Sequence, residues 1–205
     1  MIYMTRYVTY IFGMLLVCSS CSYISYNQVL PLIKSATLGD SDIALTEEYI
    51  AKQPYSFARV DLGKAANIIM VLQKVDNNFY TWVSSTGEKI ITLNGKIIKT
   101  EGLPHNLEFL NPTKFKLFSE KPNYSGTYDL LLKDPRAFVE QDFSISIIQN
   151  SPSELLIEEK ITMSILNRKY SNFYWVDKKS GKVIKTKQAI NPKLPNVRLD
   201  FIYKY

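Results

Sequence analysis

Residues 79–100 read FYTWVSSTGEKIITLNGKIIKT, a run of short apolar segments interrupted by two turn signals. Asn94-Gly95 is the stronger signal, because a type I′ hairpin turn requires positive φ at both central residues and these residue types adopt it readily. The small polar residues and glycine at 84–87 favour a second turn. The β-branched and aromatic residues on either side are typical of strands. The stretch therefore predicts three consecutive antiparallel strands at 78–83, 89–93 and 96–100.

The same alternation of short β-rich segments and turns continues on both sides of this stretch. A parallel sheet would need crossover helices, and few helical patterns separate these segments. We therefore predict a mainly β fold: a large, curved, predominantly antiparallel sheet, either a partly closed barrel or sandwich-like, with one or two short N-terminal helices. The further strands are predicted at 57–62, 67–74, 127–132, 142–149, 153–166, 172–177, 182–190 and 197–203.

Two helices and one loop complete the predicted elements. A short helix is predicted within residues 45–54: Thr46 can cap it, its acidic first turn suits the positive end of the helix dipole, and Pro54 ends it. Residues 23–38 have roughly helical apolar spacing but contain Pro31, so they form either a short amphipathic helix or a tether. Residues 103–122 hold three prolines and are predicted to form a long loop that can include a helical turn.

The composition limits the chemistry that the chain can perform. Its 205 residues are 46% hydrophobic and 13% aromatic, which suits one domain with a substantial core and excludes a disordered chain. One His and two Cys leave little material for a metal site or a nucleophile, and we expect no cofactor and no metal.

The N-terminus has the features of a lipoprotein signal peptide. Arg6 is followed by an uncharged apolar stretch, residues 7–17, which is too short to span a membrane. Two serines directly precede Cys21 and suit a lipoprotein signal peptidase, although Cys18 stands where Leu is usual. We predict a signal peptide at 1–20 and lipidation, with palmitate among the acyl chains, at Cys21. The alternative is an ordinary uncleaved membrane anchor.

Lipidation at Cys21 would set the organisation of the mature chain. Residues 21–39 would be a lipidated N-terminus with a tether or short helix, and residues 40–205 a single β-rich periplasmic domain without a disulfide. Ser22, instead of Asp, after the acylated cysteine favours the outer membrane as the site of the lipid anchor.

Catalytic motifs are scarce. The chain has no GxSxG, HExxH, P-loop or GxGxxG pattern. His105 is the single histidine, and it is either a general base or, as is more common, a loop histidine bonded to backbone. We predict that the protein is not an enzyme.

Positive charge is concentrated at the C-terminal end. Residues 160–205 carry a formal charge of +9, whereas residues 21–159 carry −4. Such a basic face could attract acidic polysaccharide, anionic lipid headgroups or an acidic partner surface, or could simply be solvated; a nucleic-acid partner is not expected in the periplasm. The candidate binding residues are Lys182, Lys185, Lys187 and Arg198, with His105 as a possible loop site.

Several segments, in order and spacing, resemble the YjbF/GfcB family of lipoproteins, associated with group 4 capsule and exopolysaccharide clusters. They begin with the Cys21 lipobox and cover nearly the whole mature chain. The others are LTEEYIAKQPY at 45–55, TWVSS at 81–85, EGLPHNL at 101–107, and YWVD at 174–177 with Gly181.

The resemblance implies a periplasm-facing outer-membrane lipoprotein that assists capsule or exopolysaccharide production or secretion, beside envelope proteins that include an outer-membrane β-barrel. It carries over no catalytic residue and only Cys21 as a functional one. We therefore expect an accessory factor that binds polymer or partners. A carrier of lipid or acyl chains is the first alternative, and a polysaccharide-modifying enzyme the second.

Overall fold

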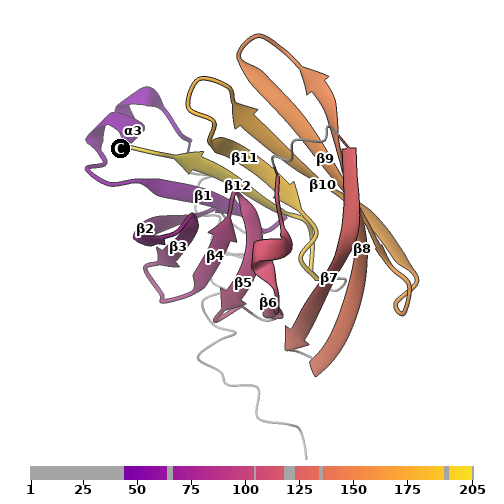
Figure 1. The fold of residues 1–205 in the computed structure, drawn as a ribbon. Coiled ribbons are helices and arrows are strands. Elements are labelled where there is room, and N and C mark those ends of the chain that lie inside the picture. Colours follow the sequence, from indigo (N-terminus) through magenta and orange to yellow (C-terminus); the bar gives the residue numbers. More distant parts are fainter. Residues whose placement is uncertain are drawn as a thin grey trace, which may run out of the picture. The chain divides into compact units, whose positions relative to one another are not determined.

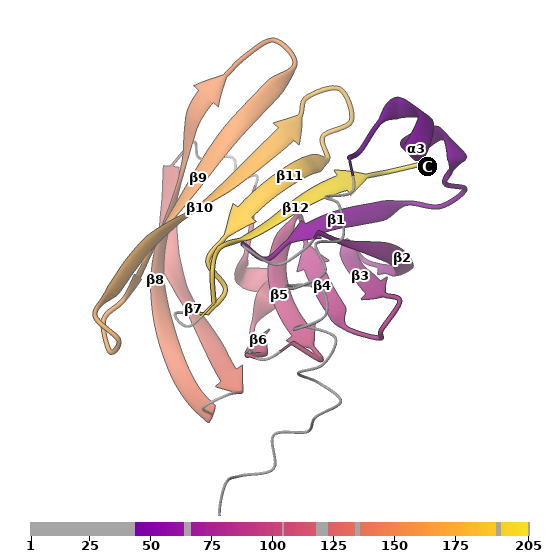
Figure 2. The same cartoon turned by 180° about the vertical axis from the view of Figure 1, so that it is seen from behind.

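In a computed structural model of the protein, the described residues are 44–63, 67–103, 105–117, 123–133, 136–191 and 194–204. They form a closed barrel in which every strand pairs antiparallel with its neighbours along the chain, and β1 pairs with β12 to complete the circle (Figures 1 and 2). The mainly β, antiparallel fold expected from the sequence is thus confirmed. The elements are α3 (Glu47–Lys52), β1 (Phe57–Asp61), β2 (Ile68–Asp76), β3 (Phe79–Ser84), β4 (Lys89–Leu93), β5 (Lys96–Glu101), β6 (Leu107–Phe109), the 3-10 helix η1 (Pro112–Lys114), β7 (Asn123–Lys133), β8 (Arg136–Asn150), β9 (Glu154–Met163), β10 (Arg168–Asp177), β11 (Val183–Gln188) and β12 (Val197–Ile202).

The turn between β4 and β5 forms as its residues predict. Asn94 has φ 49° and Gly95 has φ 80°, so both central residues are in the left-handed region. Gly95 is also required for space, because a Cβ atom there would lie 2.6 Å from Cγ1 of Val183 in β11. The Gln188 side chain of β11 donates to the Gly95 carbonyl at 2.7 Å and accepts from the Ile97 N–H at 2.9 Å. The turn is thereby held against a strand that is not its neighbour in the barrel order.

Inward and outward side chains alternate along the strands, as the two-residue period requires. In β8, residues 139, 141, 143 and 145 are buried while the positions between them face outward. The largest fully buried side chains, Trp82, Tyr128 and Tyr174, fill the interior from three different strands. The Tyr128 and Phe143 rings stack with centroids 4.0 Å apart. The barrel therefore encloses a packed core.

Helix α3 forms as expected and packs on the outside of the barrel. The Thr46 hydroxyl accepts from the Tyr49 N–H at 3.1 Å, which caps the helix. The Tyr49 ring meets Phe57 of β1 edge to face at 5.9 Å, and Lys204 donates to the Ile50 carbonyl at 2.5 Å. These contacts join the helix to β1 and to the segment that directly follows β12.

Some predicted boundaries were wrong. The segment 103–122 is not only a loop: β6 lies within it, bonded to β7 and, through Lys99 and Glu108, to β5. Helix η1 provides the helical turn expected there. A strand over 153–166 extends too far, because β9 ends at Met163 and Asn167, with φ 46°, turns the chain into β10. The signal peptide, Cys21 and the helix or tether at 23–38 lie outside the described residues.

Candidate functional site

A buried ion pair lies at the centre of the barrel. Lys96 of β5 and Glu159 of β9 are 1% and 0% exposed, and the ammonium donates to Oε1 of the carboxylate. Oε2 accepts from Asn172 Nδ2 at 2.8 Å and from the Tyr174 hydroxyl at 2.7 Å. Asn172 Oδ1 accepts in turn from the Ala189 N–H at 2.9 Å. The carboxylate is therefore bonded on both oxygens, which is the condition for burying a charge.

Three aromatic rings surround the ammonium of Lys96. Its Nζ lies 4.9 Å from the ring centroids of Phe109 and Phe115 and 4.5 Å from that of Tyr128. Each ring presents the negative face of its quadrupole, which stabilises a desolvated cation. The faces of these rings and one carboxylate thus replace the water shell of the lysine.

Burial sets the protonation behaviour of this cluster. Burial lowers the pKa of Lys96, while the charge of Glu159 and its hydrogen bond oppose that shift. Burial, followed by the nearby charge of Glu159, raises the pKa of Tyr174 and of Tyr128 well above the ordinary tyrosine range. The Tyr128 hydroxyl, although close to Glu159, makes no hydrogen bond with a described residue. Both tyrosines are therefore neutral hydroxyls at physiological pH.

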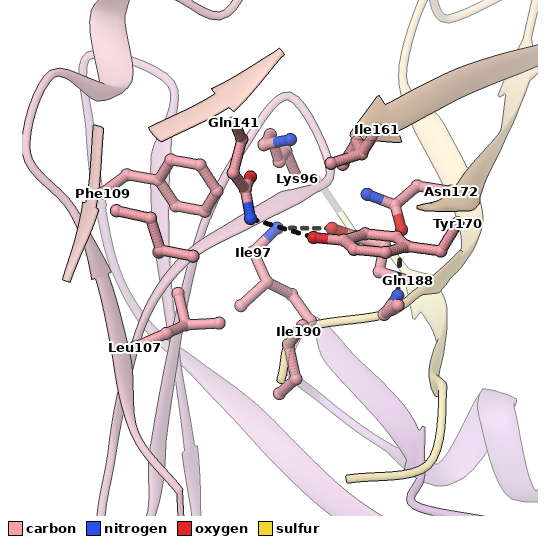
Figure 3. A pocket seen from close by; sticks show the side chains of 12 residues that line it. Lys96, Ile97, Leu107, Phe109, Gln141, Ile161, Tyr170, Asn172, Gln188 and Ile190 are labelled. Atoms are coloured by element: carbon pink, nitrogen blue, oxygen red, sulfur yellow. Dashed lines mark hydrogen bonds between the residues drawn. The ribbon is translucent and has the colours of Figure 1, made fainter. Parts of the chain in front are cut away.

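A cavity of about 10 Å³ adjoins this cluster (Figure 3). A space of that size has room for about one water molecule. Gln141 and Tyr170 border it, and Gln141 Nε2 donates to the Tyr170 hydroxyl at 2.9 Å. The perturbed Lys96 is thus enclosed, and no substrate-sized space adjoins it in the described barrel. The cluster organises the core and does not resemble an active site.

The packed interior bears directly on the acyl-carrier alternative. An acyl chain needs a deep apolar cavity, and ligand pockets usually measure about 300–1,000 Å³. In the described barrel that space is occupied by Trp82, Tyr128, Tyr174 and the cage around Lys96. The interior therefore does not fit a bound acyl chain.

Three of the four predicted basic residues share one outer face. Lys185 and Lys187 lie on β11, and Lys187 is directly opposite Arg198 of β12. Phe173 and Trp175 of β10 flank the lysines from the other side, and the Lys185 ammonium lies 4.6 Å over the Trp175 ring. This outer face, defined by these five residues, combines cations with half-buried aromatic rings.

The outer face is less basic than the sequence suggests, because Lys182 lies elsewhere and Asp200 supplies a negative charge. Lys182 precedes β11 and its ammonium lies 4.8 Å over the Tyr203 ring, apart from the other three. Asp200 stands opposite Lys185 and binds Arg59 at 2.6 Å and Arg198 at 3.3 Å. Part of the positive charge is therefore compensated on the surface itself.

His105 gives no sign of a catalytic arrangement. It lies in the connection between β5 and β6, is half-buried, and does not border the cavity beside Lys96. Within the described ranges, no three His, Cys, Asp or Glu side chains are close enough to hold a metal ion. In the same residues, no helix has both the length and the apolar character to cross a membrane.

Sequence reasoning missed the central ion pair. Lys96 follows a turn and would be expected in solvent, and Glu159 is adjacent to a second acidic residue, Glu158, in a segment whose sequence alone marks neither as buried. The one usable signal was the strand period, which places Glu159 on the same side as Ile157 and Ile161.

Comparison with known proteins gives consistent matches. Residues 31–202 match the family described as "Group 4 capsule polysaccharide lipoprotein gfcB, YjbF". The lipoprotein GfcB of Escherichia coli (strain K12), described as uncharacterized, is 22% identical over 198 residues, which cover 90% of this chain and 92% of the relative.

A solved structure has the same fold. The crystal structure of the hypothetical lipoprotein YmcC from Escherichia coli (K12) superimposes with a TM-score of 0.70 at 22% identity. The match covers 83% of this chain and 93% of the other.

Proposed function

The chain belongs to the YjbF/GfcB family of group 4 capsule polysaccharide lipoproteins, and from that membership we propose an accessory role in capsule or exopolysaccharide production. In this proposal the protein acts by binding the polymer or envelope partner proteins and catalyses no reaction. The family match over residues 31–202 is the observation that carries the role.

The geometry supports binding over catalysis. Lys96, whose pKa is lowered by burial, is enclosed by Glu159 and three rings and cannot meet a substrate without opening the barrel. A filled core leaves the outer surface and the barrel ends as the places where a ligand or partner can bind. These features favour an accessory factor over both alternatives, the acyl carrier and the polysaccharide-modifying enzyme.

The proposed location follows from the lipobox and the family. Acylation at Cys21 would anchor the chain in the outer membrane, with the barrel in the periplasm, because several acyl chains together hold a protein stably in a bilayer. There it could contact other envelope proteins of a capsule system, including an outer-membrane β-barrel.

Deletion of the gene tests the role. We expect the deletion strain to lose surface polymer, and wild-type protein supplied in trans to restore it. A Cys21→Ala variant, which cannot be acylated, should fail to restore it while accumulating as a folded protein. Normal amounts of surface polymer in the deletion strain would overturn the proposed function.

A His105→Ala variant tests the enzyme alternative in the same strain. The variant should restore surface polymer fully, because no part of the proposed role uses the imidazole. A folded His105→Ala protein that fails to restore polymer would favour a polysaccharide-modifying enzyme.

A further inference from the structure

A second, larger hollow lies at the barrel end where β10 begins and β11 connects to β12. Its volume is about 180 Å³. We call it the rim pocket. Its lining includes Arg168, Lys169, Tyr170, Asn191, Leu194 and Asn196.

The lining of the rim pocket is basic. Arg168 and Lys169 supply two positive charges, and no carboxylate is among the described residues that line it. Both cations are exposed, and neither forms an ion pair with a described carboxylate. Here, in contrast to the outer face, no ion pair with a described carboxylate compensates the positive charge. Such a pocket favours an anionic ligand, and an arginine can bind a carboxylate with two parallel hydrogen bonds.

The other walls suit a ring that bears hydroxyl groups. Asn191 and Asn196 carry amides, which can both donate to and accept from a hydroxyl. Tyr170 and Leu194 supply apolar surface on which the C–H face of a sugar ring can lie. At about 180 Å³ the pocket is smaller than the about 300–1,000 Å³ of sites for drug-sized ligands, so it suits one sugar unit.

The floor of the rim pocket is held from inside the barrel. Tyr170 and Ala189 border both the rim pocket and the inner cavity. The Tyr170 hydroxyl accepts from Gln141 Nε2, as the dashed line in Figure 3 shows. Gln141 is 1% exposed, and its Oε1 has no hydrogen-bond partner among the described residues. The ring is thus fixed before a ligand arrives, which lowers the entropy cost of binding.

We propose that the rim pocket binds one carboxylate-bearing sugar unit of an acidic polysaccharide. Arg168 and Lys169 bind the carboxylate, Asn196 binds a ring hydroxyl, and Tyr170 with Leu194 supports the sugar ring. The assignment of a sugar rests on the proposed function, whereas the assignment of negative charge rests on the pocket alone.

Ligand-observed NMR with the purified full-length lipoprotein in detergent tests this site. The probes are glucuronic acid, glucose and inorganic phosphate, each titrated separately. We expect glucuronic acid to bind at least about tenfold more tightly than either of the others, because only it combines the ring with the carboxylate. If glucose bound as tightly as glucuronic acid, the proposed preference for an anionic ligand would be wrong. If phosphate bound as tightly as glucuronic acid, the proposed recognition of a sugar ring would be wrong.

Two charge-matched double variants locate the binding. Arg168→Gln/Lys169→Gln should weaken glucuronic acid binding by about tenfold or more, since it removes both charge-assisted contacts. Lys178→Gln/Lys179→Gln removes the same charge from two exposed residues at the other end of β10 and should leave affinity unchanged. An equal effect of both pairs, or no effect of the first, would overturn the assignment; unchanged melting temperatures establish that both proteins are folded.

Failure of the pocket and failure of the proposed function are distinguishable. Lost surface polymer in the deletion strain, together with no glucuronic acid binding, would overturn the pocket and leave the accessory role. Pocket-specific binding together with normal surface polymer would overturn the accessory role and leave the pocket as a site for sugar acids.

Discussion

Replacing Glu159 by Gln should strongly destabilise the barrel, because it leaves the Lys96 ammonium without a counter-charge. The ammonium is 2% exposed, and Glu159 is its one hydrogen-bond acceptor among the described residues. Lys96 could escape by losing its proton; at pH 7, against an ordinary pKa of 10.5, this costs about 5 kcal/mol. Breaking buried ion pairs typically costs about 3–5 kcal/mol. We therefore expect a loss of about 3–5 kcal/mol.

Urea unfolding followed by tryptophan fluorescence measures this loss, since Trp82 is fully buried in the core. For a domain of this size the expected fall in melting temperature is roughly 6–20 °C. The double variant Lys96→Met/Glu159→Gln removes the stranded charge, and Met can pack against the three rings of the cage. It should therefore be less destabilised than Glu159→Gln alone, a non-additivity that a double-mutant cycle quantifies.

The pH dependence of the Glu159→Gln variant provides an internal check. Burial holds the pKa of Lys96 below its ordinary value, and removing the opposing charge of Glu159 lowers it further. Between the lowered pKa of Lys96 in the folded variant and 10.5, the unfolded chain binds one proton more than the folded chain, so stability rises with pH by up to about 1.4 kcal/mol per pH unit. This range extends to lower pH in the variant than in the wild type. The gap between variant and wild type should thus narrow from pH 6 to pH 9. A gap that stays constant, or a variant as stable as wild type at pH 7, would refute this reasoning.

Three further predictions follow from the packing. Gly95→Ala should cost about 2–5 kcal/mol in chemical denaturation, because it combines positive φ with the contact to Val183; Gly87→Ala, with positive φ but open space, should cost only about 1–2 kcal/mol. Gln188→Leu should cost about 2–4 kcal/mol of stability, because it leaves the Gly95 carbonyl and the buried Ile97 N–H without a hydrogen-bond partner. The same replacement at an exposed glutamine on a strand should cost less, and an equal cost would contradict the role assigned to Gln188. Burial raises the pKa of Tyr124 to about 12, above its unfolded value of 10, so its contribution to stability is complete below pH 10 and is lost as pH rises through 12; denaturant midpoints that do not fall over this interval would argue against it.

The order of the strands could be predicted from local chemistry, but the closure of the barrel could not. Asn94-Gly95 sets its turn through residues adjacent in sequence. The pairing of β1 with β12 instead joins Arg59 to Asp200, which lie 141 positions apart. Nothing in either segment by itself specifies that partner, so the sequence left a partly closed barrel and a sandwich as open choices.

The buried lysine shows why side-chain burial is harder to predict than strand position. Lys96 follows the tight turn directly and, read locally, belongs in solvent. It is buried because four side chains from distant parts of the chain surround its ammonium. They are the carboxylate of Glu159 and the rings of Phe109, Phe115 and Tyr128. A compensated charge of this kind requires the three-dimensional fold.

The candidate binding residues illustrate the limit of counting charge. The +9 of residues 160–205 pointed to the lysines of β11, where Asp200 and its ion pairs compensate part of the charge. Arg168 and Lys169 belong to the same excess, but only the meeting of β10 with the β11–β12 connection reveals a hollow beside them. A local sequence pattern does not show whether surface residues line a pocket.

Binding without chemical change is the central claim, and light scattering coupled to size-exclusion chromatography tests it most directly. The purified lipoprotein in detergent is incubated with purified surface polysaccharide from the strain that produces it, and the mixture is then separated. We predict that polymer and protein elute together while the molar mass of the polymer is unchanged after the protein is removed. A polymer that is shortened in proportion to the incubation time would contradict the account. A polymer of unchanged molar mass that elutes without bound protein would contradict polymer binding and leave envelope partner proteins as the binding target.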